Sequence, residues 1–144
     1  MFKHILIPTD GSALSEKAIQ GGVALAQSLG AKITGYASLA KYPYTPITEF
    51  MVETPTDFRA HGEALANTHL AIIESAAKAA GVPYASYLSE ADLPYEGIIA
   101  AAKQQACDLI LMASHGHSGL SALILGSETQ KVLTHSTIPV LIYR

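Results

Sequence analysis

The sequence has little of what marks secreted, membrane-bound or nucleic-acid-binding proteins. It contains one cysteine, Cys107, so no disulfide can form within the chain, and a reducing cytoplasm is the expected location. Its 9 lysines and arginines are outnumbered by 12 aspartates and glutamates, whereas a nucleic-acid-binding surface is normally basic. The apolar run of residues 5–7 stops at Pro8, which is too short for a signal peptide or a membrane span. We therefore expect a soluble cytoplasmic protein that binds neither nucleic acid nor a membrane.

The remaining composition is that of one globular domain covering residues 1–144. Nearly half of the residues, 49%, are hydrophobic and only 15% are charged, which is enough apolar material for a real core. Strands and helices alternate along the chain, and this order predicts an α/β fold, a doubly wound parallel sheet sandwiched by helices. The expected strands are 4–8, 32–38, 84–90 (an edge strand), 109–113 and 140–143, and the expected helices are 12–29, 59–80, one that starts at Pro94 and one that starts at 126–127.

Polar residues and glycines mark where the helices begin and end. Ser12 is a suitable N-cap for the first helix, and Gly30 is placed to end it in the left-handed conformation. Gly21 and Gly22 within that helix indicate close packing on the sheet. The expected buried face of the helix at 59–80 consists of Leu65, Ile72, Ala76 and Ala80.

A long segment without a regular pattern runs from Leu39 to Phe58. It contains three prolines and several aromatic residues. Loops of this length are uncommon in compact domains and are often lids or binding loops. The alternative interpretation is a mobile excursion on the surface.

The clearest functional pattern lies between Leu109 and Leu133. The apolar run 109–113 predicts a strand that is buried on both faces. A polar loop with Gly116 and Gly119 follows, and Gly126 and Ser127 open a helix. A strand, a glycine-containing loop and a helix N-terminus together can bind a phosphate, because free backbone N–H groups and the positive end of the helix dipole converge there.

Other chemistries fit the sequence less well. It contains neither a Walker-type P-loop nor a Gly-x-Gly-x-x-Gly dinucleotide fingerprint. Ser118 sits in a sequence similar to a hydrolase nucleophile elbow, but the second glycine, Gly119, comes one position too early. His115 and His117 could ligate a metal, although no cysteine or third ligand is near them in the sequence. Asp10 could accept a phosphoryl group, but the extra acidic pair of such proteins is absent.

Four separated motifs give the chain a resemblance to a known family. Residues 7–12 (Ile-Pro-Thr-Asp-Gly-Ser), 114–116 (Ser-His-Gly), 126–127 (Gly-Ser) and 139–141 (Pro-Val-Leu) resemble those of the universal stress protein family. The resemblance implies a five-stranded parallel α/β sheet of the Rossmann-like type, a cytoplasmic location and a homodimer. One branch of the family binds ATP through Gly-x-x-Gly, nine further residues, and Gly followed by Ser or Thr. The present chain keeps Gly116, Gly126 and Ser127 of that pattern but has Ala113 in place of the first glycine.

The resemblance assigns roles to individual residues. Gly116 and Gly126 would let a phosphate approach the backbone, and Ser127 would add a hydroxyl donor. Asp10 would accept from a ribose hydroxyl or help to hold Mg²⁺ through the phosphates. Ala37 and Met112 would flank the adenine. The complete candidate set for ATP, ADP or AMP is Pro8, Thr9, Asp10, Ala37, Met112, Ala113, Gly116, His117, Gly126, Ser127, Glu128 and Thr129.

These observations favour a nucleotide-binding stress protein that acts as a sensor or regulator. No evident general base is present, so no catalytic residue is assigned, and any ATP hydrolysis should be slow. The alternative is a family member that binds no nucleotide and acts through its dimer surface. In either case the short apolar strand Val140–Tyr143 is expected to pair with its copy in a homodimer. A hydrolase or phosphotransferase that uses Asp10 or Ser118 is the least favoured reading.

Overall fold

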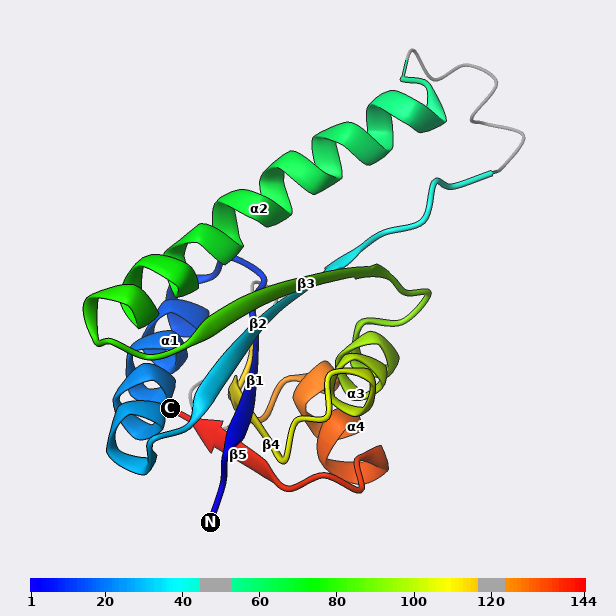
Figure 1. The fold of residues 1–144 in the computed structure, drawn as a ribbon. Helices are drawn as coiled ribbons and strands as arrows, with labels where there is room; N and C mark the ends of the chain where they lie inside the picture. Colours follow the sequence, from blue (N-terminus) through cyan, green and yellow to red (C-terminus); the bar gives the residue numbers. More distant parts are fainter. Residues whose placement is uncertain (45–52, 117–123) are drawn as a thin grey trace.

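Five parallel strands form one sheet, with the order β3-β2-β1-β4-β5 (Figure 1). A computed structural model describes residues 1–44, 53–116 and 124–144. The strands are β1 His4–Pro8, β2 Lys32–Leu39, β3 Tyr84–Glu90, β4 Leu109–Ala113 and β5 Val140–Tyr143. The helices are α1 Ala13–Leu29, α2 Pro55–Ala79, α3 Pro94–Gln104 and α4 Ser127–His135. The predicted fold class, a doubly wound parallel α/β sheet, is confirmed, and β3 and β5 are its edges.

The helices cover the two faces of the sheet in pairs (Figure 1). Helices α1 and α2 pack on one face, where they share a core with Ile5 and Ile7 of β1. Helices α3 and α4 pack on the other face, against Leu6 of β1 and Ile110 of β4. Successive residues of β1 thus enter opposite cores, which explains why the strand is apolar throughout.

The ends of α1 are capped as the sequence predicted. The Ser12 hydroxyl accepts a hydrogen bond from the backbone N–H of Ser15 at 3.2 Å. Gly30 adopts a left-handed conformation with a φ of 62° and so ends the helix. A β-carbon on Gly22 would lie 2.6 Å from Cδ1 of Ile7, so a larger residue would force the Ile7 side chain to move.

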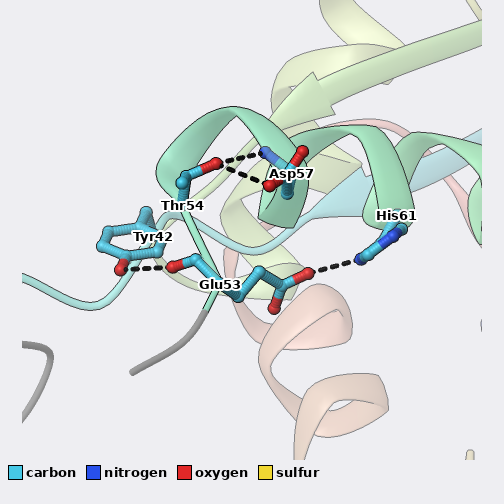
Figure 2. Close-up of polar contacts among 5 residues, drawn as sticks. All are labelled: Tyr42, Glu53, Thr54, Asp57 and His61. Atoms are coloured by element: carbon cyan, nitrogen blue, oxygen red, sulfur yellow. Dashed lines mark hydrogen bonds and ion pairs between the residues drawn. The ribbon is translucent and has the colours of Figure 1, made fainter. Parts of the chain in front are cut away.

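Helix α2 begins earlier than the sequence indicated. It starts at Pro55, so the last residues of the expected irregular segment are helical. Figure 2 shows how this end is held: Thr54 Oγ1 accepts from the N–H of Asp57 at 3.1 Å, and the Tyr42 hydroxyl donates to the carbonyl oxygen of Glu53 at 3.0 Å. The side chain of His61 also contacts the Glu53 carboxylate.

The expected face of α2 is confirmed only in part, because Ile72, Ala76 and Ala80 are half-buried against the core and Leu65 is not. Leu65 is 59% exposed, whereas Ala66, Leu70, Ile73 and Ala77 form the buried stripe. This stripe is rotated by about one residue from the predicted one. Within the described parts of the chain, no helix is both long enough and apolar enough to cross a membrane.

Candidate functional site

A cavity of about 550 Å³ opens at the carboxyl ends of the central strands. This volume lies in the range of small-molecule sites, about 300–1,000 Å³. Its position also agrees with the rule that ligands of open α/β sheets bind beyond the carboxyl ends of the strands. Among the residues predicted for the site, the cavity is lined by Pro8, Thr9, Asp10, Met112, Ala113, Gly116, Gly126, Ser127, Glu128 and Thr129.

The loop after β1 forms one wall of this cleft. The Thr9 N–H donates to the carbonyl oxygen of Tyr36 at 2.9 Å, which ties the loop to β2. Asp10 Oδ1 accepts from the N–H of Ser12 at 2.9 Å, so the side chain closes a turn on its own backbone. Gly11 sits within this turn at a φ of 78°, a conformation that other residues rarely adopt.

The start of α4 forms the opposite wall. Gly126 is the N-cap residue, and its N–H donates to the carbonyl oxygen of Ser114 at 2.8 Å. The Thr129 hydroxyl donates to the carbonyl oxygen of Ala113 at 3.1 Å, which fixes the helix to the end of β4. The first N–H groups of a helix have no partner within the helix. Those of residues 127–129 could therefore donate to a ligand in the cleft.

Two glycines permit the close approach of these walls. A β-carbon on Gly126 would lie 2.9 Å from Cβ and 3.0 Å from Cα of His115. A β-carbon on Gly116 would lie 2.1 Å from Oδ2 of Asp10. The loop after β1 and the loop after β4 therefore meet, as their positions at the ends of parallel strands predicted.

One predicted residue, Ala37, does not line the cavity. The Ala37 side chain is buried in the core beneath α1 and α2, whereas its neighbours Tyr36 and Ser38 line the cleft. Ala37 can therefore contact a ligand in this cleft only through its main chain. His117 lies outside the described residues, as does Ser118.

Sequence reasoning missed several lining residues. They are Ser15, Tyr36, Ser38, Pro94, Ile98, His115, Ile124 and Leu125. Tyr36 and Ser38 could have been found from the position of β2 in the sheet, because alternate residues at a strand end face the same side. Pro94 and Ile98 belong to α3, and no local motif links that helix to the cleft.

The charged groups of the cleft are held by specific contacts. Glu128 Oε2 accepts from the N–H of Tyr95 at 2.8 Å, and Glu128 Oε1 lies 3.2 Å from Nζ of Lys131. The carboxylate of Glu128 therefore points toward the start of α3.

A neutral polar group, the Tyr36 hydroxyl, also lines the cleft. It shares a 2.9 Å hydrogen bond with the Ser89 hydroxyl, in which either group can be the donor. Burial raises the pKa of the Tyr36 phenol, which therefore stays neutral.

The described side chains of the cleft provide few ligands for a metal ion. Among residues 1–44, 53–116 and 124–144, no group of three or more histidines, cysteines, aspartates or glutamates could hold one. The described partner of His115 Nδ1 is the Ser114 hydroxyl at 3.1 Å. A cation in the cleft would need ligand oxygens in addition to Asp10.

The chain is similar over its full length to proteins of one family. A sequence model described as "Universal stress protein family" matches residues 1–144. The chain is 33% identical over 144 residues to a universal stress protein of Thermus aquaticus, with 100% of both chains covered. Among solved structures, MJ0577 of Methanocaldococcus jannaschii superimposes with a TM-score of 0.83 at 25% identity, covering 99% of the present chain and 95% of that chain.

Two further structures share the fold and carry nucleotides. One is a universal stress protein in complex with cAMP, with a TM-score of 0.71 at 22% identity over 99% of this chain and 97% of that chain. The other is the universal stress protein from Archaeoglobus fulgidus in complex with dAMP, with a TM-score of 0.73 at 15% identity over 100% and 98%. Given the match over all 144 residues, the chain belongs to the universal stress protein family.

Proposed function

We propose that this protein binds an adenine nucleotide in the cleft, with the phosphates at the start of α4, and acts as a nucleotide-dependent regulator of the stress response. The observation that carries the proposal is the meeting of Gly116, Gly126 and the helix N-terminus in one cavity. Because neither glycine has a side chain, a phosphate has access to the backbone N–H groups there.

The opposite part of the cleft suits a nucleobase. Ile98 and Met112, from the core beneath α3 and α4, line it together with Pro8, while Tyr36 and Ser38 add polar edges. A planar base could be buried among such apolar atoms and be oriented by a few polar groups. The neighbours that bind cAMP and dAMP add support from the same fold.

Asp10 is the residue that we expect to contact the ribose or a phosphate-bound Mg²⁺. Its Oδ1 is oriented by the N–H of Ser12, and its Oδ2 lies beside Gly116. Mg²⁺ usually binds through one or two carboxylates together with substrate phosphates. Its binding would therefore depend on a nucleotide such as ATP.

Isothermal titration calorimetry with ATP, ADP and AMP tests the proposal. The informative variant is Ser127→Glu, which places a carboxylate at the first residue of α4. A negative charge there favours the helix, so the fold should survive while phosphate binding is repelled. The matched control is Thr56→Glu, which adds the same charge near the exposed start of α2. We expect the dissociation constant to rise about tenfold or more in Ser127→Glu and to stay unchanged in Thr56→Glu. Wild-type protein that is folded but binds none of the three nucleotides at millimolar concentration would refute the proposal.

The second part of the proposal concerns assembly. Strand β5 is an edge of the sheet, and its Leu141 and Tyr143 are 36% and 37% exposed. A bare apolar edge strand is a site for pairing with another chain. We expect it to pair antiparallel with its copy across a two-fold axis, and this surface would carry the function if no nucleotide were bound.

A further inference from the structure

The cleft that we assign to nucleotide phosphates is lined by acidic and not by basic side chains. Among the described residues that line it, Asp10 and Glu128 are carboxylates and none is a lysine or arginine. The sequences of the two segments outside the description, 45–52 and 117–123, contain no lysine or arginine either. The attraction for phosphate therefore comes from backbone dipoles and not from cationic side chains.

Glu128 is placed where it opposes that attraction. It is the second residue of α4, and its Oε2 accepts from the N–H of Tyr95, the second residue of α3, at 2.8 Å. The N-cap residue of α3, Leu93, provides no side-chain hydrogen bond to the helix start. Glu128 thus adds a carboxylate to the start of α3, beside Glu96 of its first turn, while it lines the cleft at the start of α4.

Lys131 offsets the charge of Glu128 only in part. Its Nζ lies 3.2 Å from Glu128 Oε1, but the two side chains are 45% and 36% exposed. Ion pairs that are this exposed are held weakly, because solvent competes for both groups. Lys131 Nζ also lies 5.5 Å from the ring centre of Tyr95, and Lys131 does not line the cleft. Lys131 therefore offsets the charge of Glu128 only in part, and a phosphate in the cleft meets the remaining negative charge.

From this arrangement, and resting on the proposed nucleotide site, we propose that Glu128 is a specificity-determining residue: it makes the cleft select adenine nucleotides by charge, disfavouring a free triphosphate relative to a monophosphate. ATP carries more negative charge than AMP, so it is repelled more strongly by a fixed carboxylate. Because Glu128 is 36% exposed, solvent also screens this repulsion, and we expect it to change the dissociation constant by at most about tenfold. A divalent cation bound to ATP lowers the charge that faces Glu128 and should relieve this selection.

The experiment compares AMP with ATP in EDTA, by calorimetry, on wild type and on the variant Glu128→Gln. The glutamine oxygen can still accept from the N–H of Tyr95, so the variant removes the charge and keeps the cap. We expect the affinity for ATP to rise about tenfold and that for AMP about threefold. Excess Mg²⁺ should strengthen ATP binding to wild type and reduce the gain in the variant. The matched control is Glu74→Gln, which removes the same charge from an exposed position on α2 that does not line the cleft.

A second variant separates the charge of Glu128 from its contact with α3. Glu128→Ala removes both the charge and the contact. If the charge sets the selection, this variant should also gain more affinity for ATP than for AMP. If Glu128 served only as a cap, Glu128→Gln would resemble wild type and Glu128→Ala would weaken both nucleotides equally. That result would overturn the inference and leave the proposed nucleotide site in place. Equal ratios of the ATP and AMP dissociation constants in wild type and Glu128→Gln would do the same. Failure of every variant and of wild type to bind either nucleotide would remove the proposed function and this inference together.

Discussion

The Oδ2 atom of Asp10 lies 2.1 Å from the position that a β-carbon on Gly116 would occupy. The carboxylate after β1 and the glycine after β4 thus share one small space at the end of the cleft that we assign to phosphates. In Gly116→Ala the new methyl group must displace the Asp10 side chain, which is exposed and can rotate away. We expect a folded protein whose nucleotide affinity falls about tenfold, or about 1.4 kcal/mol.

A second glycine provides the control for this prediction. A β-carbon on Gly62, within α2, would lie 3.7 Å from Cδ2 of Leu39, which is an ordinary contact. Gly62→Ala should therefore leave binding unchanged and raise the free energy of unfolding by about 0.5–1 kcal/mol. Calorimetry and urea unfolding measure the two effects. Unchanged nucleotide binding in Gly116→Ala would contradict the role that we give to this contact.

Much of the fold could be predicted because its signals are local. The apolar runs at β1 and β4 are bounded by polar or turn residues, and Ser12 and Gly30 cap α1 through contacts within a few residues. Helix α2 was predicted less well because it is rich in alanine. Buried and exposed positions then differ little in hydrophobicity, and the pattern did not distinguish the exposed Leu65 from the buried stripe that begins at Ala66.

The site could be predicted where a motif lies on one loop and not where contacts join distant segments. β2 is buried on both faces along most of its length, so its sequence does not reveal which residues face which side. Ala37 is named from the family resemblance, whereas in the structure its neighbours Tyr36 and Ser38 line the cleft. The contact between Glu128 and Tyr95 joins residues 33 positions apart, and no local pattern indicates it.

The buried His4 should make stability depend on pH. Its Nε2 lies 2.8 Å from Oγ1 of Thr34, and burial, together with the charge of Lys32, lowers the pKa of His4 below its usual 6.5. The unfolded chain therefore binds a proton at a higher pH than the native protein does. The stabilising contribution is complete above about pH 6.5 and is lost as the pH falls toward the lowered pKa.

Urea unfolding between pH 7.5 and 5 measures this effect. We expect the free energy of unfolding to fall with pH more steeply in wild type than in His4→Gln, which has no titrating group at this position. Because other histidines contribute equally to both proteins, the difference between the two slopes isolates His4. Parallel slopes would show that His4 keeps the same pKa on unfolding.

The proposed dimer makes a separate prediction about β5. Leu141 is exposed on this edge strand, whereas Ile142 packs toward the core beneath α3 and α4. Leu141→Lys should therefore introduce repulsion between paired copies without disturbing the core, and the protein should become monomeric. Leu133→Lys is the control, because Leu133 is 41% exposed on α4 and lies outside the strand. Analytical ultracentrifugation at micromolar concentration distinguishes the states, and a monomeric wild type would exclude the interface.

Ala113 is the one position where the chain departs from the glycine pattern of the nucleotide-binding branch. It ends β4 and lines the cleft, and among the described residues other than glycine only Ala106 has a positive φ. The backbone at Ala113 is thus one that any L-residue adopts, so its methyl group costs no backbone strain. Its carbonyl oxygen accepts from the Thr129 hydroxyl at 3.1 Å, a contact that does not require glycine.

We therefore expect Ala113→Gly to change nucleotide affinity by less than about threefold, while greater backbone freedom lowers the free energy of unfolding by about 0.5–1 kcal/mol. Titration of wild type and variant with Mg-ATP at one temperature, each preceded by a thermal melt, measures both quantities. The comparison with Gly116→Ala is informative, because both changes involve one methyl group at the same cleft. A wild type that binds no nucleotide beside an Ala113→Gly variant that does would show that the methyl group closes the site. The non-binding reading, in which the protein acts through its β5 surface, would then apply.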